Sequence, residues 1–295
     1  MVVTIGTFDG IHLGHQFMIK KLVDRAKELS MKSAVIFFEP QPKEFFMGTQ
    51  SPSRLTSVRD KLSLFKSMGL DYVALIKFDT NIQSLSAEQF IKNILVDSMA
   101  VKDLIVGDDF KFGSDRKGNF QLLKYFGNTY SFAVENTQTY QVNGVRVSST
   151  LIRELIKANS IENVDLYLGK KYFISGRIHH GDKVGRKIGF PTANMRIPKN
   201  IAVSGVYVVN TTISKKLYFG IANVGSRPTV SGQKFLLEVH LYDFSGDLYG
   251  QHLTISFLKH VRDEEKFNSF EELSNQIQKD KEFGYSWVKK YTNRL

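Results

Sequence analysis

Two histidines in the run GTFDGIHLGH, residues 6–15, have the type and spacing that chemistry on phosphates requires. His12 and His15 are three residues apart, so both imidazoles share one face of a helix that opens here. The first turn of such a helix offers unpaired N–H groups to an anion. Three glycines allow a tight turn and a close approach of backbone to phosphate: Gly6, Gly10 and Gly14. The run predicts a phosphate site with two imidazole donors.

A hydroxyl-rich segment, VSSTLIR at residues 147–153, has a similar character. Ser148, Ser149 and Thr150 would enter a helix together, with hydroxyls beside the free N–H groups of its first turn. Arg153 follows one turn later, where a guanidinium can hold phosphate oxygens. Simple N-capping explains the three hydroxyl residues equally well, so both interpretations stay open.

A third run, GDKVGRKIGFPTAN at residues 181–194, is rich in glycine and cations. The sequence contains no P-loop pattern, which excludes a kinase of that type. A flexible basic loop suits the covering of phosphates, and its residues are Gly181, Lys183, Gly185, Arg186, Lys187 and Gly189. After Pro191, Thr192 and Asn194 face one side of an extended segment and offer oxygen ligands that suit Mg²⁺. A glycine-rich hairpin loop without a ligand explains this run equally well.

A carboxylate in LEVHLYDF, residues 237–244, is the last candidate. The alternation of a strand puts Glu238 on the face opposite Leu237 and Val239. On this pattern alone, a solvated strand face is as good an explanation as a catalytic group.

The first half of the chain alternates strand-like and helical runs. The strand-like runs are rich in Val, Ile and aromatic residues, and they are Val2–Ile5, Ala34–Phe38, Tyr72–Phe78, Leu104–Val106 and Tyr130–Val134. His15–Leu29 and Leu55–Met68 carry apolar residues at helical spacing. Ser86 and Gln89 form a capping box ahead of the helix Phe90–Val96. This alternation predicts an α/β domain with a mostly parallel sheet that binds its ligand at the carboxyl ends of the strands.

The second half has a different pattern after Gly169. Five strand-like runs are separated by turns rich in Gly, Asn and Ser, which predicts a small antiparallel β-barrel or sandwich; they are Phe173–Ile178, Val206–Thr212, Leu217–Asn223, Phe235–Tyr242 and Leu253–Leu258. A terminal helix follows, with a capping box at Ser269 and Glu272 and an apolar face of Leu273, Ile277 and Phe283. We therefore divide the chain into residues 1–170 and 171–295.

Composition narrows the class of protein. The 295 residues contain no cysteine, which excludes disulfides and thiolate catalysis and suits a reducing compartment. The sequence shows neither a signal peptide nor an apolar run of membrane-spanning length, so we expect a cytoplasmic protein. The formal net charge of +11 indicates an anionic partner, either nucleic acid or small phosphorylated molecules. The cations are spread along the chain, which favours local phosphate sites over nucleic acid.

The first half resembles the nucleotidyltransferase superfamily, and GTFDGIHLGH is similar to its FAD synthetase branch. VSSTLIR and VGDDFKFG, residues 106–113, are similar to further motifs of that family, as is FFEPQPKEFF, residues 37–46, where Gln41 replaces a common histidine. The resemblance implies adenylylation of FMN by ATP. His12 and His15 would stabilise the transferring phosphate, and Arg153 would hold the leaving pyrophosphate. The remaining motif residues would line the nucleotide site, namely Gly6, Phe8, Asp9, Gly10, Gly14, Asp109, Ser148, Ser149 and Thr150.

The second half resembles riboflavin kinases. The match starts at PTAN, residues 191–194, and continues in order through NVGSRPT, LEVHLYDF, LYG and the stretch Arg262–Phe267. The resemblance implies a riboflavin kinase-like barrel in which Glu238 accepts the proton of the riboflavin 5′-hydroxyl. Thr192 and Asn194 would hold Mg²⁺, and the residues of the 181–191 run and Arg262 would contact the nucleotide or flavin.

The two resemblances together imply a bifunctional enzyme whose substrates are riboflavin, FMN and ATP, with no nucleic-acid or membrane partner. An adenylyltransferase for another phosphorylated acceptor is one alternative, and a basic nucleic-acid-binding protein is the other. Related proteins have a short segment ahead of the first strand, whereas here Met1 lies almost at the start of that strand. We expect this to weaken flavin binding at the first site.

Overall fold

The structure is a computed structural model that describes residues 1–180, 190–229 and 232–293. Its contacts group the chain into two compact units. The first unit comprises Met1–Pro52 and Val58–Ser149, and the second comprises Ser53–Ser57 and Thr150–Leu295.

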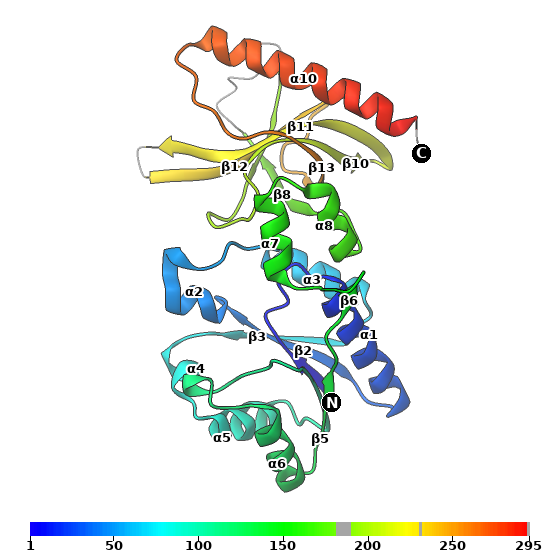
Figure 1. The fold of residues 1–295 in the computed structure, drawn as a ribbon, viewed down its shortest axis with the longest axis vertical. Helices are drawn as coiled ribbons and strands as arrows, with labels where there is room; N and C mark the ends of the chain where they lie inside the picture. The colour runs from blue at the N-terminus through cyan, green and yellow to red at the C-terminus, as the bar shows by residue number, and fades with distance from the viewer. Residues whose placement is uncertain (181–189, 230–231, 294–295) are drawn as a thin grey trace. The chain divides into compact units, whose positions relative to one another are not determined.

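A five-stranded parallel sheet forms the centre of the first unit (Figure 1). Its strands lie in the order β3-β2-β1-β4-β5. The chain runs from β1 outward to β3 on one side and then returns to β4 and β5 on the other. Such a reversal opens a crevice at the carboxyl end of the central strand, the usual ligand position in open α/β sheets. The strands are β1 (Val2–Ile5), β2 (Ser33–Glu39), β3 (Tyr72–Lys77), β4 (Asp103–Gly107) and β5 (Ala133–Thr137).

Helices cover both faces of this sheet, as is general for parallel sheets in α/β domains. Val2, Val35 and Ile105 point to the face covered by α1 (Leu13–Glu28) and α3 (Val58–Ser67). The alternate residues Val3 and Ile36 point to the other face. That face is covered by α5 (Ala87–Phe90), its π-helical continuation Ile91–Ser98, and α6 (Phe120–Tyr130). Smaller elements are α2 (Pro42–Met47), α4 (Thr80–Ser84), the 3₁₀ turns Gly48–Gln50 and Ser114–Arg116, and the hairpin of β6 (Gln141–Val142) and β7 (Val145–Arg146).

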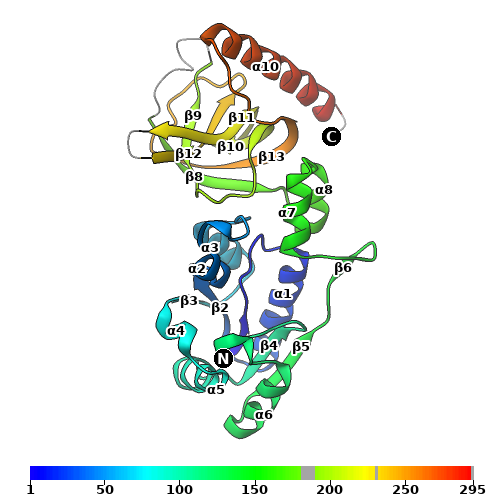
Figure 2. The same cartoon turned by 60° about the vertical axis from the view of Figure 1, so that its left-hand side comes forward.

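A closed antiparallel barrel forms the centre of the second unit, with its strands in the order β10-β11-β12-β9-β8-β13 (Figure 2). The strands are β8 (Phe173–His179), β9 (Ala193–Arg196), β10 (Gly205–Ile213), β11 (Lys216–Thr229), β12 (Gly232–Leu241) and β13 (His252–Arg262). Two short helices, α7 (Ser149–Lys157) and α8 (Ile161–Leu168), add Ile152, Ile156 and Val164 to the barrel core.

The terminal helix α10 (Phe270–Thr292) lies over the barrel (Figure 2). Half of its predicted capping box is confirmed, because the Ser269 hydroxyl accepts from the Glu272 amide at 3.1 Å. The Glu272 carboxylate accepts from the Asn268 amide at 3.0 Å instead of from the Ser269 amide. The predicted apolar face is wrong at Phe283, which is 45% exposed. The buried positions are instead Asp280 and Gly284, and a Cβ at Gly284 would lie 2.3 Å from the Tyr242 hydroxyl.

Two sequence-based elements in the first half need correction. The strand predicted over Tyr130–Val134 begins only at Ala133, because α6 runs to Tyr130 and ends at Ser131 in the left-handed conformation. The helix predicted over Leu55–Met68 begins only at Val58. Just before it, Arg54 forms an isolated β-bridge with Ile201, with its carbonyl accepting from the Ala202 amide at 2.9 Å, and Leu55 packs in the core of the second unit.

Candidate active sites

The paired imidazoles lie where β1 gives way to α1. His12 is the N-cap of α1, and its Nδ1 accepts a hydrogen bond from the His15 amide at 3.3 Å. The two rings stack with centroids 3.6 Å apart and planes 16° apart. Since Nδ1 of His12 is an acceptor, its Nε2 carries the proton in the neutral ring and remains a donor. The predicted proximity of the two imidazoles is confirmed.

Tight packing shapes the loop before the histidines. A Cβ on Gly6 would lie 3.0 Å from the Phe8 ring, and a Cβ on Gly14 would lie 3.3 Å from the His12 ring. Gly10 has a φ of 86°, a left-handed conformation that glycine adopts without strain. These three glycines therefore permit the loop to fold against its own aromatic rings.

The hydroxyl segment holds this loop from another side. The Ser149 Oγ donates to the Asp9 carbonyl at 2.8 Å, and Asp9 is only 1% exposed. Ser149 begins α7, as the sequence predicted, while Ser148 is half-buried and Thr150 is exposed. Ser149 thus supports the backbone of the loop in addition to any role toward phosphate.

Arg153 belongs to the second unit, where its Nε donates to the Ser53 carbonyl at 2.6 Å. Asp109 lies in the first unit after β4 and is exposed, and Arg146 of β7 contacts it at 2.8 Å. Gln41 is buried and is the N-cap of α2. Its backbone N–H donates to the Glu44 carboxylate at 2.9 Å. Gln41 therefore takes part in capping α2, while its buried Nε2 makes no hydrogen bond to the described residues.

In the barrel, register brings the predicted kinase residues together. Glu238 on β12 lies opposite Asn194 on β9 and opposite Asn223 on β11. Its neighbours Leu237 and Val239 are 0% and 1% exposed, so Glu238 points to the other side of the strand, as predicted. One carboxylate is therefore flanked by two amides on adjacent strands.

Thr192 and Asn194 are also close to each other. The Asn194 Nδ2 lies 3.4 Å from the Thr192 Oγ1 and 3.2 Å from the Thr192 carbonyl. With the amide nitrogen directed to Thr192, the Asn194 Oδ1 points the other way. A hydroxyl and an amide oxygen at the end of one strand are hard ligands that fit Mg²⁺, which takes few protein ligands and fills its shell from phosphates and water. Within the described part of the chain, no group of three or more His, Asp or Glu is placed to hold a metal ion.

His240 is a residue that sequence reasoning missed. Its Nδ1 lies 3.0 Å from the Pro191 carbonyl, and its ring packs edge-on against Phe190 at 5.5 Å. Burial lowers the pKa of the imidazole below its ordinary value of 6.5. His240 ties β12 to the start of the segment that carries Thr192 and Asn194. Its position two residues after Glu238, and thus on the same strand face, was the available signal.

Arg262 is engaged in a buried ion pair. Its Nη2 and Nε contact the Asp280 carboxylate at 2.8 and 3.0 Å, and its Nη1 donates to the Asp263 carbonyl at 2.9 Å. Asp280 is also held by Gln276 at 2.8 Å. The guanidinium therefore fastens β13 to α10.

The six predicted residues of the basic loop, Gly181, Lys183, Gly185, Arg186, Lys187 and Gly189, lie outside the described residues.

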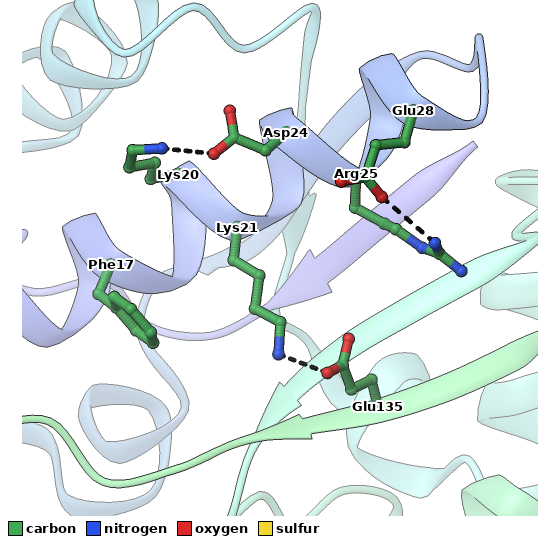
Figure 3. Close-up of a pocket in the computed structure, with 7 residues that line it drawn as sticks. All are labelled: Phe17, Lys20, Lys21, Asp24, Arg25, Glu28 and Glu135. Atoms are coloured by element: carbon green, nitrogen blue, oxygen red, sulfur yellow. Dashed lines mark hydrogen bonds and ion pairs between the residues drawn. The ribbon is translucent and has the colours of Figure 1, made fainter.

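A surface groove of about 440 Å³ runs along α1 (Figure 3). Its charged side chains neutralise one another, with Lys20 facing Asp24, Lys21 facing Glu135 and Arg25 facing Glu28. Each of these three cations is thus paired with a carboxylate, and the groove contains none of the predicted site residues.

The fold and the two clusters define a two-domain transferase, with a nucleotidyltransferase-type α/β unit followed by a kinase-type barrel. The family profile for FAD synthetase matches residues 1–151, and that for riboflavin kinase matches residues 168–288. The chain belongs to the family of bifunctional riboflavin kinase/FMN adenylyltransferases, as its similarity to whole relatives also shows. The protein of that name from Haemophilus influenzae is 44% identical over 95% of this chain and 91% of its own length. The Escherichia coli K12 protein is 43% identical, with 95% and 90% covered.

A solved structure from Streptococcus pneumoniae, described as a macrolide-efflux protein, has the same fold along almost the whole chain. It superposes with a TM-score of 0.77 at 29% identity and covers 97% of this chain and 94% of its own. In the part of this chain that is described, none of the helices combines the length and apolar character needed to cross a bilayer.

Proposed function

We propose that this chain phosphorylates riboflavin to FMN in its barrel and adenylylates FMN to FAD in its α/β unit. Membership of the family supports both reactions. The observation that carries the proposal is the presence in one chain of two clusters suited to phosphate transfer. One is the stacked pair His12 and His15, and the other is Glu238 paired in register with Asn194.

For adenylyl transfer, a phosphate oxygen of FMN attacks the α-phosphorus of ATP, and the bond to the β-phosphate oxygen breaks to release pyrophosphate. No protein nucleophile is needed, so positioning and neutralisation of charge supply the catalysis. His12 and His15 donate hydrogen bonds to the phosphate oxygens as negative charge develops. The loop from Gly6 to Gly14 presents its backbone to the phosphates, Arg153 holds the leaving pyrophosphate, and Asp109 positions the nucleotide.

For phosphorylation, Glu238 accepts the proton of the riboflavin 5′-hydroxyl as that oxygen attacks the γ-phosphorus of ATP. ADP leaves with the electrons of the broken bond. Thr192 and Asn194 would hold Mg²⁺, and the bound ion would supply neutralising charge to the phosphates.

We propose the division predicted from the sequence, in which residues 1–170 carry the transferase and residues 171–295 carry the kinase. The matched family profiles leave 152–167 between them, where α7 and α8 lie. We further propose that the enzyme works in the cytoplasm on small molecules, without a nucleic-acid partner. A salt-dependent shift with single-stranded oligonucleotide would contradict the last point.

The experiment is a chromatographic time course with riboflavin, ATP and Mg²⁺. FMN should appear first and FAD afterwards, with FAD and pyrophosphate forming together when FMN is supplied directly. Phosphorylation or adenylylation of another acceptor, without turnover of riboflavin or FMN, would replace this proposal with a different transferase on the same scaffold.

A further inference from the structure

A fully buried lysine stands behind the histidine loop. Lys61 on α3 is 0% exposed, and its Nζ donates to the Thr7 carbonyl at 2.8 Å and lies 5.2 Å from the centre of the Phe37 ring. Lysine is almost never fully buried, because removing its ammonium from water costs free energy that hydrogen bonds inside the protein must offset. A leucine or methionine would fill the same space without that cost. The hydrogen bond from the ammonium to the Thr7 carbonyl therefore explains why a lysine occupies this position.

The carbonyl that it holds belongs to a strained piece of backbone. Phe8, the next residue, has a φ of 48°, a backbone conformation that residues other than glycine rarely adopt. Such a conformation persists only where the surroundings over-determine it. Here the carbonyl before Phe8 is bound by Lys61 and the carbonyl after it, that of Asp9, is bound by Ser149 at 2.8 Å. Two hydrogen bonds thus bracket the strained residue.

Phe8 in turn determines where the imidazoles lie. Its ring is 1% exposed and packs at 5.1 Å against the His15 ring, which stacks on His12 at 3.6 Å. Releasing the Thr7 carbonyl would allow Phe8 to relax toward an unstrained φ, and its ring would withdraw from His15. The chain of contact therefore runs from Lys61 through the loop backbone and Phe8 to both histidines.

We propose that Lys61 is a positioning residue for adenylyl transfer, which acts by holding the loop from Thr7 to Asp9 in the conformation that aligns His12 and His15. This inference rests on the proposed adenylyltransferase function. Lys61 does not touch the reacting atoms, so its loss should slow the chemical step and leave substrate binding largely intact.

Lys61→Met tests this, because methionine matches the length of the side chain and lacks the donor. With FMN and ATP as substrates, kcat for FAD formation should fall ~10- to 100-fold, the scale of a misplaced catalytic group, while KM stays within about threefold. Riboflavin phosphorylation by the same protein should stay within about twofold, which reports intact folding of the second unit, while the retained KM reports that the first unit still binds its substrates. Lys66→Met is the matched control, since Lys66 is on the same helix and exposed.

Two further variants separate positioning from simple support of the fold. Lys61→Arg keeps a donor and should recover part of the kcat that Lys61→Met loses. Phe8→Leu should lower kcat by itself, and Phe8→Leu combined with Lys61→Met should lose no more than the larger single effect, since both act through one path. If Lys61→Met fails to fold, Lys61→Arg and Phe8→Leu still decide the question.

Lys61→Met with unchanged kcat, or losses that multiply in the double variant, would overturn the inference and leave the adenylyltransferase function standing. A wild-type protein that forms no FAD from FMN would overturn both together.

Discussion

The stacked imidazoles at the start of α1 give the first prediction at the scale of single residues. His15→Ala should lower FAD formation from FMN by at least ~10²-fold, the cost of losing one preorganised donor to a developing oxyanion. Riboflavin phosphorylation should continue, so FMN accumulates. Chromatography of the reaction mixture measures both. Near-wild-type FAD formation would remove His15 from the site.

Glu238 gives the converse prediction. Glu238→Gln keeps the shape of the side chain and removes its capacity to accept a proton, so riboflavin phosphorylation should slow ~10²–10⁴-fold. Adenylylation of supplied FMN should stay unchanged in the same preparation. Retention of near-full kinase activity would show that another group takes the proton.

Residue types and spacing identified the histidine pair and the face of Glu238, because both depend on local geometry that a turn or a strand dictates. The roles of Lys61 and His240 depend on contacts with backbone carbonyls far away in sequence. Lys61 meets Thr7, which is 54 positions away, and His240 meets Pro191, which is 49 positions away. No local pattern marks such a partner. For the same reason, no sequence motif indicated the ion pair of Arg262 with Asp280.

At the scale of elements, that ion pair joins β13 to α10. Arg262→Met should destabilise the second unit by about 3–5 kcal/mol, because the Asp280 carboxylate would remain buried without its cation. Chemical denaturation measures the loss. Lys92→Met is the control, since Lys92 pairs with Asp97 on the surface and should cost at most about 1 kcal/mol. Equal effects of the two variants would contradict a stabilising role for the buried pair.

His240 predicts a dependence of stability on pH. Burial holds its pKa below the ordinary 6.5, so the unfolded chain takes up a proton at a higher pH than the folded barrel does. Stability from this site is present above about pH 6.5 and is lost as the pH falls below it. His240→Gln should flatten this part of the profile, measured as Tm between pH 8 and pH 5.5. Parallel profiles for both proteins would refute it.

Most strands were predictable, since Val- and Ile-rich runs mark them directly, whereas β9, which lacks such a run, was not among the predicted strands. The two misplaced elements have tertiary causes. Arg54 and Leu55 continue a helical pattern in sequence, yet pairing with the segment around Ile201 and burial in the core of the second unit override it. The helix Phe120–Tyr130 was missed because its aromatic residues also suit a strand, and its Asn119 cap is the signal that distinguishes them.

At the scale of the whole molecule, the two clusters lie in separate units of one chain. His15→Ala and Glu238→Gln should therefore complement each other when mixed. Neither variant alone should convert riboflavin to FAD at an appreciable rate, whereas the mixture should do so after a lag in which free FMN accumulates. The time course of FMN and FAD measures this. No FAD from the mixture, with each single activity intact, would mean that FMN does not pass through solution.

Closure of the barrel has a further consequence for behaviour under heat stress. A closed ring of six strands has no first or last member, so it offers no row of unpaired backbone groups to another molecule. The parallel sheet does end, at β3 and β5, and β3 carries the exposed side chains Tyr72 and Leu75. Intermolecular strand pairing, and the aggregation that follows from it, should accordingly start from the α/β unit, and a charge introduced at Leu75 should delay it.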